Sequence, residues 1–428
     1  SKQKRKRSKR KRRKHMKNGD IRRSRILMGN FPDIHWRAVP MDHLRLHPLF
    51  SNLPTPESIT RLDSLEDVRM FTQESWQWDA LHSGRCTTSK AASALGLLEP
   101  RAGHALNIPV SWRKGGKSAY FRLRQTPLDT LEEMNRVLCG KRMNVMQPMI
   151  HESELHKQPV WVIPAVRNEG SSFPFAAKYM IKITPEERAR RKEQAMQYAA
   201  SDGLSVRMSW GTTQEATSLL TALNYFWKKD TGVRLEEVGM CGAGLSSNQT
   251  GSVLIGASPD AILHHSNGTM EALEVKNHCP FVPSSFVDEN EADFAVRQIP
   301  FRNPTVPPLY VPQLMMEMLC VGHECRSAIM VRQTATNGAV IMRMHRDDEW
   351  IDEMMYWLNR FQQDYVKQGI VPPIDFFWND NDESERYQQF IVRTRELSNS
   401  VEVLDIVKHH EIQRVVATSR NITSLFLD

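Results

Sequence analysis

Residues 252–277 read Ser-Val-Leu-Ile-Gly-Ala-Ser-Pro-Asp-Ala-Ile-Leu-His-His-Ser-Asn-Gly-Thr-Met-Glu-Ala-Leu-Glu-Val-Lys-Asn. The apolar run at 252–256 predicts a buried strand that ends near Asp260. Asn267-Gly268 predicts a tight turn, so residues 261–265 and 270–277 are expected to pair as a hairpin. Such a hairpin would direct Asp260 and Glu274 at one point. Lys276 would share the face of Glu274, because side chains alternate along a strand.

Two carboxylates and a lysine in this arrangement suit the hydrolysis of a phosphodiester. Carboxylate oxygens are the ligands that Mg²⁺ (or Mn²⁺) prefers, and Mg²⁺ takes few protein ligands beside substrate phosphates. A lysine beside the ion can hold or deprotonate the attacking water. The alternative is a surface hairpin whose charges face solvent, because a Pro-Asp followed by Glu-x-Lys is short enough to occur by chance.

Three flanking segments place further polar groups near this hairpin. Residues 209–229 have helical apolar spacing, and Glu215 lies early on that helix, where it either reaches the metal or only interacts with the helix dipole. Residues 310–319 predict a short buried helix in which Gln313 needs a hydrogen-bond partner. The segment 78–89 leads into an Ala-rich helix, with hydroxyl groups that either bind an anion or cap the helix.

This order of features resembles the PD-(D/E)xK nuclease superfamily, and within it the YqaJ-like viral recombinase group that includes phage lambda exonuclease. The resemblance covers about residues 70–97 and 205–370. It rests on Trp78, Gly84, Thr87, Ser89, Trp210, Gly211, Glu215, Ser258, Pro259, Asp260, Glu274, Val275, Lys276, Cys279, Pro280, Phe281, Tyr310 and Gln313. It implies an α/β fold with a central mixed β-sheet flanked by helices. It also implies a Mg²⁺-dependent DNA exonuclease that starts from a 5′ end and acts in recombination or repair.

The resemblance assigns roles to the residues of the metal site. Asp260, Glu274 and the Val275 carbonyl would bind Mg²⁺. Glu215 would serve a second ion or the water, and Lys276 the nucleophile. Gln313 would lie beside the metal on the later helix. The family often carries Gln-x-Gln there, whereas this chain has Met at position 315.

The resemblance also implies a pocket for a 5′-phosphate. Thr87 and Ser89 would hold the phosphate. His82 stands where the family often has an arginine, and Arg85 lies close enough in the sequence to substitute. Because His82 is expected to titrate near neutrality, a preference for phosphorylated ends should weaken as pH rises.

Residues 1–25 hold the positive charge of the chain. They contain 15 Lys and Arg and one acid, a net +14, whereas the whole chain is +8, so residues 26–428 carry −6. Such a segment cannot form a core and is expected to be disordered unless bound to an anion. It reads either as a nuclear import signal or as an arm that grips DNA or RNA phosphates. The arm residues are Lys4, Arg5, Lys6, Arg7, Lys9, Arg10, Lys11, Arg12, Arg13 and Lys14.

The arm also bears on the compartment of the protein. A dense run of Lys and Arg favours the nucleus, with a mitochondrion or plastid as alternatives. A transit peptide is normally amphipathic and Ser-rich, which this segment is not. The six cysteines show no paired spacing, which suits a reducing compartment. No apolar run is long enough to cross a bilayer, so no membrane partner is expected.

Composition divides the chain into five segments. We predict a basic arm at 1–29, an N-terminal extension with the first core helices at 30–97, an insertion at 98–204, a nuclease core at 205–370 and a C-terminal extension at 371–428. The insertion holds a basic stretch at 112–117 and a helix that starts at Thr184. Asn337-Gly338 predicts another hairpin, and 347–367 an amphipathic helix.

Three potential soft metal ligands lie close together at residues 320–325. Cys320, His323 and Cys325 lack the second half of a zinc site, so we interpret them as the end of a buried helix followed by a strand.

The alternative function of the protein belongs to another class of protein. In it, a nuclease fold of weak or no activity is a structural RNA- or ribonucleoprotein-binding component, for example of the ribosome, anchored by the arm. DNA is the favoured partner, and the sequence gives no oligomeric state.

Overall fold

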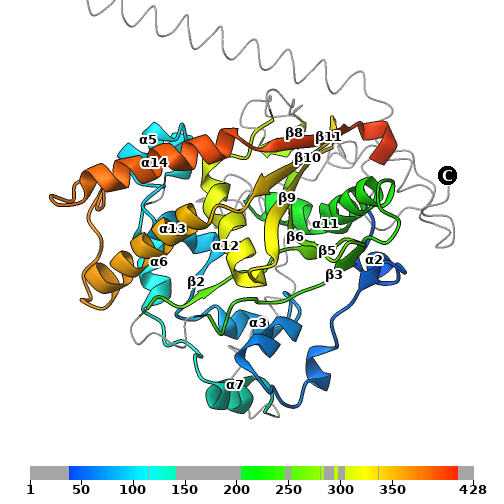
Figure 1. Cartoon of the computed structure of the whole chain (residues 1–428), viewed down its shortest axis with the longest axis horizontal. Coiled ribbons are helices and arrows are strands. Elements are labelled where there is room, and N and C mark those ends of the chain that lie inside the picture. Colours follow the sequence, from blue (N-terminus) through cyan, green and yellow to red (C-terminus); the bar gives the residue numbers. More distant parts are fainter. Residues whose placement is uncertain are drawn as a thin grey trace, which may run out of the picture.

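The centre of the molecule is a seven-stranded mixed sheet in the order β1-β3-β5-β6-β9-β10-β11 (Figure 1). A computed structural model describes residues 38–113, 115–140, 204–245, 252–279, 281–283, 294–296, 304–335 and 337–412. The sheet strands are Phe50–Ser51 (β1), Arg234–Glu236 (β3), Ala261–His264 (β5), Met270–His278 (β6), Cys325–Thr334 (β9), Gly338–His345 (β10) and Glu402–Val407 (β11). The predicted α/β fold with a central mixed sheet is confirmed.

The two hairpins predicted from Asn-Gly turns form the middle of the sheet. β5 pairs antiparallel with β6, and β9 pairs antiparallel with β10. Gly268 adopts a φ of 84°, which glycine reaches without the steric cost of a side chain. β6 and β9 run parallel and lie side by side at the sheet centre, with Lys276 opposite Arg332. Both hairpin predictions are therefore confirmed.

Helix α11 (Leu204–Trp227) covers one face of the sheet. The helix predicted over 209–229 is confirmed, but it begins earlier, at Leu204. Its apolar side chains and the strand residues of this face form one core. The core includes Ala216, Leu219, Leu220, Ala222, Leu223 and Phe226 against Ala261, Leu263, Leu273, Val275, Ile329, Val331, Ala339 and Ile341. The alternate strand residues therefore point to the opposite face.

Helices α12 (Val311–Val321), α13 (Asp348–Phe361) and α14 (Ser384–Asn399) cover that opposite face, so α11 and α12 flank the sheet from two sides (Figure 1). The strand residues in this second core are Ile262, Ala272, Ala328, Met330, Val340, Met342 and Met344. The amphipathic helix predicted over 347–367 is α13, followed by a π-helical turn, Gln362–Val366 (η6). Burying apolar side chains on both faces fixes the register of every central strand.

Shorter elements surround this framework. They are α2 (Met41–Arg45), α3 (Trp76–Leu81), α4 (Thr88–Ala94), α5 (Pro100–Ala105), α6 (Lys117–Leu123) and α7 (Leu131–Leu138), with the 3-10 turns η1 (Pro56–Ser58), η2 (Leu65–Met70), η3 (Val110–Trp112) and η5 (Pro308–Tyr310). Two strand pairs stand apart, β2 (Cys86–Thr87) with β4 (Ile255–Gly256), and β7 (Phe281–Pro283) with β8 (Phe294–Val296). The strand expected over 252–256 is thus shorter than predicted and pairs with β2, outside the central sheet.

Several predictions fall outside the described residues. The basic arm, the helix at Thr184 and Lys114 of the basic stretch lie there. Within the described part of the chain, no helix combines the length and apolar character needed to span a membrane.

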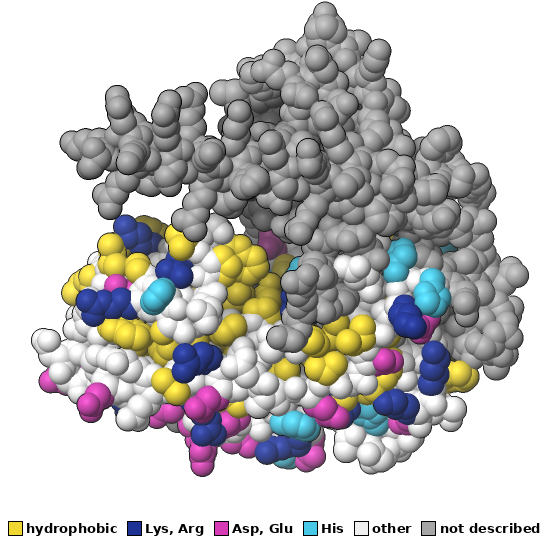
Figure 2. Space-filling view, turned by 90° about the horizontal axis from the view of Figure 1, so that it is seen from above, with side chains coloured by type: hydrophobic (Ala, Val, Ile, Leu, Met, Phe, Trp, Pro, Cys, Tyr) yellow, Lys and Arg dark blue, Asp and Glu magenta, His cyan; other side chains and the backbone are white. Residues whose placement is uncertain are grey.

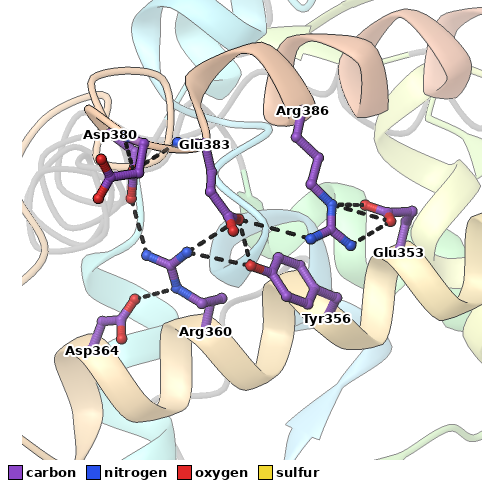
Figure 3. Close-up of polar contacts among 8 residues, drawn as sticks. Glu353, Tyr356, Arg360, Asp364, Asp380, Glu383 and Arg386 are labelled. Carbon is purple, nitrogen blue, oxygen red and sulfur yellow. Dashed lines mark hydrogen bonds and ion pairs between the residues drawn. The ribbon is translucent and has the colours of Figure 1, made fainter.

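Ion pairs tie the segment after α13 to the two helices on either side of it (Figure 3). Arg360 on α13 contacts three carboxylates at 2.6–3.2 Å, those of Asp364, Asp380 and Glu383. Arg386 on α14 contacts Glu353 at 2.6 Å and lies over the ring of Tyr356, 3.6 Å from its centroid. Because the charges share partners, this is a network rather than an isolated surface pair. It holds α14 against α13, and β11 follows α14 into the sheet.

A second network surrounds the buried carboxylate of Glu271 on β6. His265 Nε2 lies 2.8 Å from Glu271 Oε2, Arg343 Nε donates to Oε1 at 2.7 Å, and Ser327 Oγ also donates to Oε1. Burial alone would raise the pKa of Glu271, but these partners lower it to about 2. A folded-state pKa below the ordinary 4.5 stabilises the fold fully above pH 4.5. That stabilisation is lost as pH falls from 4.5 through 2.

We predict that Glu271→Gln lowers the free energy of unfolding by about 3 kcal/mol at pH 7, because one pKa unit is equivalent to about 1.4 kcal/mol. The difference from wild type should shrink at pH 3. Urea unfolding at both pH values measures it. The matched control is Glu402→Gln, which removes an exposed partner of Arg343 and should change stability by about 0.5 kcal/mol or less. Equal losses in both variants would contradict this account.

Candidate active site

The β5–β6 hairpin brings the predicted carboxylates together. Asp260 directly precedes β5, and its Oδ2 accepts a hydrogen bond of 2.6 Å from the backbone N–H of Val275 in β6. Val275 packs in the core under α11, so Glu274 and Lys276 point to the face of α12. The three residues therefore meet at one place, as the sequence predicts.

Lys276 is held among acids. Its Nζ contacts Glu274 Oε1 and lies 5.2 Å from the centroid of the Tyr310 ring. Burial would lower the pKa of Lys276, but the neighbouring carboxylates of Glu274 and Asp260 raise it above its ordinary value. The lysine is therefore a cation at neutral pH, able to donate hydrogen bonds to a phosphate oxygen or a water molecule.

Glu215 reaches the same group from α11. Burial, and then repulsion by Glu274, raises the pKa of Glu215 to about 7. Because α11 begins at Leu204, Glu215 lies in the interior of the helix rather than in its first turn. The interpretation of Glu215 as a first-turn residue that interacts with the helix dipole is therefore wrong, since that interaction acts only over the terminal turn.

Glu317 is a fourth carboxylate that the sequence interpretation missed. It is fully buried on α12, where Gln313 Nε2 donates a 2.9 Å hydrogen bond to its Oε1. Its Oε2 has no hydrogen-bond partner in the described structure. Burial and repulsion by Glu274 raise the pKa of Glu317 well above the ordinary value. One signal was present: Glu317 is the single charged residue of α12 and lies one turn after Gln313.

The site therefore concentrates negative charge. The pKa of Asp260 is raised by burial and by repulsion from Glu274 and Glu215. Oxygen donors that repel one another suit a hard divalent cation. Within the residues that the structure describes, no three Asp, Glu, His or Cys side chains are arranged to hold a metal ion. Mg²⁺ needs only one or two carboxylates beside water and phosphate oxygens, so Asp260 and Glu274 with the Val275 carbonyl fit it.

The residues predicted for the 5′-phosphate lie around β2 and the start of α4. The hydroxyl groups of Thr87 and Ser89 are 3.2 Å apart. Trp78 Nε1 donates to Ser258 Oγ at 2.9 Å, which joins α3 to the segment that carries Asp260. The pairing of Thr87 with Gly256 connects the hydroxyl pair to the segment that leads to Asp260.

His82 and Arg85 differ from the expectation. His82 Nδ1 bonds the carbonyl of Trp78 at 2.9 Å, and burial lowers the pKa of His82 below its ordinary 6.5. A lowered pKa reduces the charged fraction of His82 at neutral pH, so burial weakens the basis for the predicted pH dependence of end preference. Arg85 is fully buried, and its guanidinium donates to the carbonyls of Leu128 and Ile255. In this structure the guanidinium of Arg85 is therefore bound to backbone carbonyls and is not exposed to solvent.

The cysteine-rich segment is structural. α12 ends at Val321 and β9 begins at Cys325, as interpreted from the sequence. The side chain of His323 is 88% exposed and contacts Glu324. Cys320 and Cys325 are buried.

A mixed sheet whose central hairpin carries an acid, then Glu-x-Lys, defines a chain with a PD-(D/E)xK nuclease fold. Residues 178–324 match the family model of the YqaJ-like viral recombinase domain. The predicted resemblance to this family is thus confirmed over residues 178–324. The match includes Glu215, Asp260, Glu274, Lys276 and Gln313.

Two further comparisons complete the picture. A crystal structure of an alkaline exonuclease from Laribacter hongkongensis is similar, with 16% identity, over 45% of this chain and 84% of that protein, and a TM-score of 0.24. No curated protein matches the chain.

The charge repulsion around Glu317 has a consequence for stability. We predict that Glu317→Gln raises the Tm of the metal-free protein by about 2–4 °C, because it keeps the volume and removes one repelling charge. Thermal unfolding in a chelator measures this. Glu317→Ala is the control for lost packing and should lower stability by about 2 kcal/mol or more. A Tm that falls equally in both variants would contradict the repulsion.

Proposed function

We propose that the protein is a divalent-metal-dependent DNA exonuclease, directed to 5′ ends, that acts in recombination or repair. The observation that carries the proposal is the meeting of Asp260, Glu274 and Lys276 at one point of the sheet, fixed by the Asp260–Val275 hydrogen bond. The family match of residues 178–324 supports the reaction class.

Asp260, Glu274 and the Val275 carbonyl would hold Mg²⁺ or Mn²⁺. When bound, the ion supplies Lewis-acid polarisation of the phosphate and a lower pKa for the attacking water. Lys276 donates a hydrogen bond that orients the water or a phosphate oxygen. Glu215 lies where it can take the proton of the water or serve a second ion. Gln313 and Glu317 hold the α12 side of the site in place through their mutual hydrogen bond.

The acids of the site do not favour the alternative of an inactive fold that binds RNA or a ribonucleoprotein. A fold kept only for binding has no need to hold four mutually repelling carboxylates, whose burial costs free energy. Replacement of those acids by neutral residues would have favoured that alternative.

The arm at residues 1–25 keeps its predicted roles as proposals. Its net +14 supports contact with DNA phosphates without sequence preference, and it supports nuclear localisation. On the face shown in Figure 2, basic and acidic side chains are interspersed over the described surface, and Lys and Arg do not gather into one patch there. Deleting residues 1–25 should therefore flatten the salt dependence of DNA binding, and an unchanged slope would rule out this role.

We predict that Asp260→Asn and Glu274→Gln each reduce cleavage of 5′-phosphorylated linear duplex DNA roughly a thousandfold, equivalent to about 4 kcal/mol of transition-state stabilisation. Chelator should abolish wild-type cleavage. Lys276→Ala should lower the rate without changing metal affinity, because the lysine is not a ligand. Glu402→Gln, an acid far from the site, is the matched control. Wild-type rates in both acid variants would overturn the site.

We predict a preference for 5′-phosphorylated ends of about tenfold, from charge-assisted hydrogen bonds at Thr87 and Ser89. Rates on 5′-phosphate and 5′-hydroxyl duplexes measure it. Ser89→Ala should erase the preference, whereas Ser83→Ala, whose hydroxyl bonds the Thr126 carbonyl, should keep it. The preference should be constant from pH 7 to 8.5, because the lowered pKa leaves His82 neutral. If the wild type cleaves 5′-phosphate and 5′-hydroxyl duplexes at equal rates, the assignment of a 5′-phosphate pocket is wrong.

A further inference from the structure

Three basic side chains follow one another on the central strands beside the acid site. In the parallel pairing of β6 and β9, Lys276 is opposite Arg332 and His278 is opposite Thr334. Paired residues of neighbouring strands point to the same face, and the strands lie about 4.8 Å apart. Lys276, His278 and Arg332 therefore share the face covered by α12. Arg332 Nε donates to His278 Nε2 at 3.2 Å.

Arg332 differs from the other arginines of β9 and β10. Arg326 pairs with Asp348, and Arg343 pairs with Glu271. In the described structure no carboxylate pairs with Arg332. Its guanidinium donates through Nε to His278 and through Nη1 to the Thr305 carbonyl at 3.1 Å. A partly buried cation without a counter-ion costs free energy, which an anionic ligand would offset.

The surroundings of Arg332 indicate which kind of anion it would bind. The ring of Tyr310 lies over Lys276, and Lys276 pairs with Arg332 in the register of β6 and β9, so the two cations are next to each other. A guanidinium matches the oxygens of a phosphate with two parallel donors.

We propose that Arg332, oriented by His278, binds the phosphodiester next to the scissile one, so that Lys276 and Arg332 contact two successive phosphates of one strand. This rests on the proposed nuclease function. The subsite lies on β6 and β9, away from the Thr87–Ser89 hydroxyl pair, and binds an internal phosphate rather than a 5′ terminus. The opposing view is that Arg332 only fixes the segment at Thr305.

Binding of 5′-phosphorylated duplex DNA to the full chain tests the proposal, with Ca²⁺ in place of Mg²⁺ to suppress cleavage and with salt varied. Arg332→Gln should raise Kd about tenfold and reduce the slope of log K against log salt by about one. Arg326→Gln, on the same strand and paired with exposed Asp348, should change neither quantity.

Arg332→Lys separates binding from structure. A lysine keeps the positive charge but cannot donate the two parallel hydrogen bonds of a guanidinium. The slope of log K against log salt should therefore equal the wild-type value, whereas the affinity should recover only in part. Arg332→Gln with wild-type Kd and slope would overturn the subsite. If Arg332→Gln does not fold, the lysine variant decides: weaker binding at an unchanged slope supports the subsite, and wild-type affinity overturns it.

The same assay separates this inference from the proposed function. A wild type that binds DNA but does not cleave it in Mg²⁺ overturns the nuclease function, while the binding difference of Arg332→Gln still supports the phosphate contact. A wild type that cleaves, with no effect of Arg332→Gln on binding, keeps the function and overturns the subsite. A wild type that binds no DNA overturns both.

Discussion

The hydrogen bond from the Val275 backbone to the Asp260 carboxylate joins the two halves of the site, and its geometry depends on strand register. The pairing of Ala261 with Leu273 sets Val275 beside Asp260. A slip of one residue would turn Glu274 and Lys276 toward α11 and expose the core side of β6 to α12. Apolar packing on both faces of the sheet makes that slip costly. The chemistry of the site is thus held in place by the core.

Two buried glutamates, Glu271 and Glu317, show how the surroundings of a carboxylate shift its pKa in opposite directions. The pKa of Glu271 falls because His265, Arg343 and Ser327 surround its carboxylate. The pKa of Glu317 rises because its burial is accompanied by the charge of Glu274 and only one amide donor. The first stabilises the fold, whereas the second costs stability. Carboxylates that repel one another inside a stable core are a common feature of functional sites.

The sequence predicted the parts that depend on local patterns. Asn-Gly turns and alternating strands gave both hairpins, and helical spacing gave α11 and α13. The sequence did not predict side-chain environments that depend on residues distant in the chain. No local pattern shows that Arg85 is buried among carbonyls, or that burial lowers the pKa of His82.

Two other features also depended on the tertiary fold. Glu317 was overlooked because a charged residue in an apolar helix is normally read as exposed, and only the packing of α12 on β6 shows that it faces Glu274. The start of α11 was placed at residue 209, five residues later than its observed start at Leu204.

Under the proposed function, two parts of the chain would bind DNA, the basic arm and the cations of the central sheet. Residues 26–428 carry a net −6, the same sign as DNA, whereas residues 1–25 carry +14 and would supply the long-range attraction. Attraction of this kind depends on charge and does not depend on DNA sequence. Position must come from cations that the sheet itself holds, and Lys276 and Arg332 are fixed by the pairing of β6 with β9. Under the proposed function, the strand pair that would orient the metal-binding acids would therefore also set where a DNA strand lies.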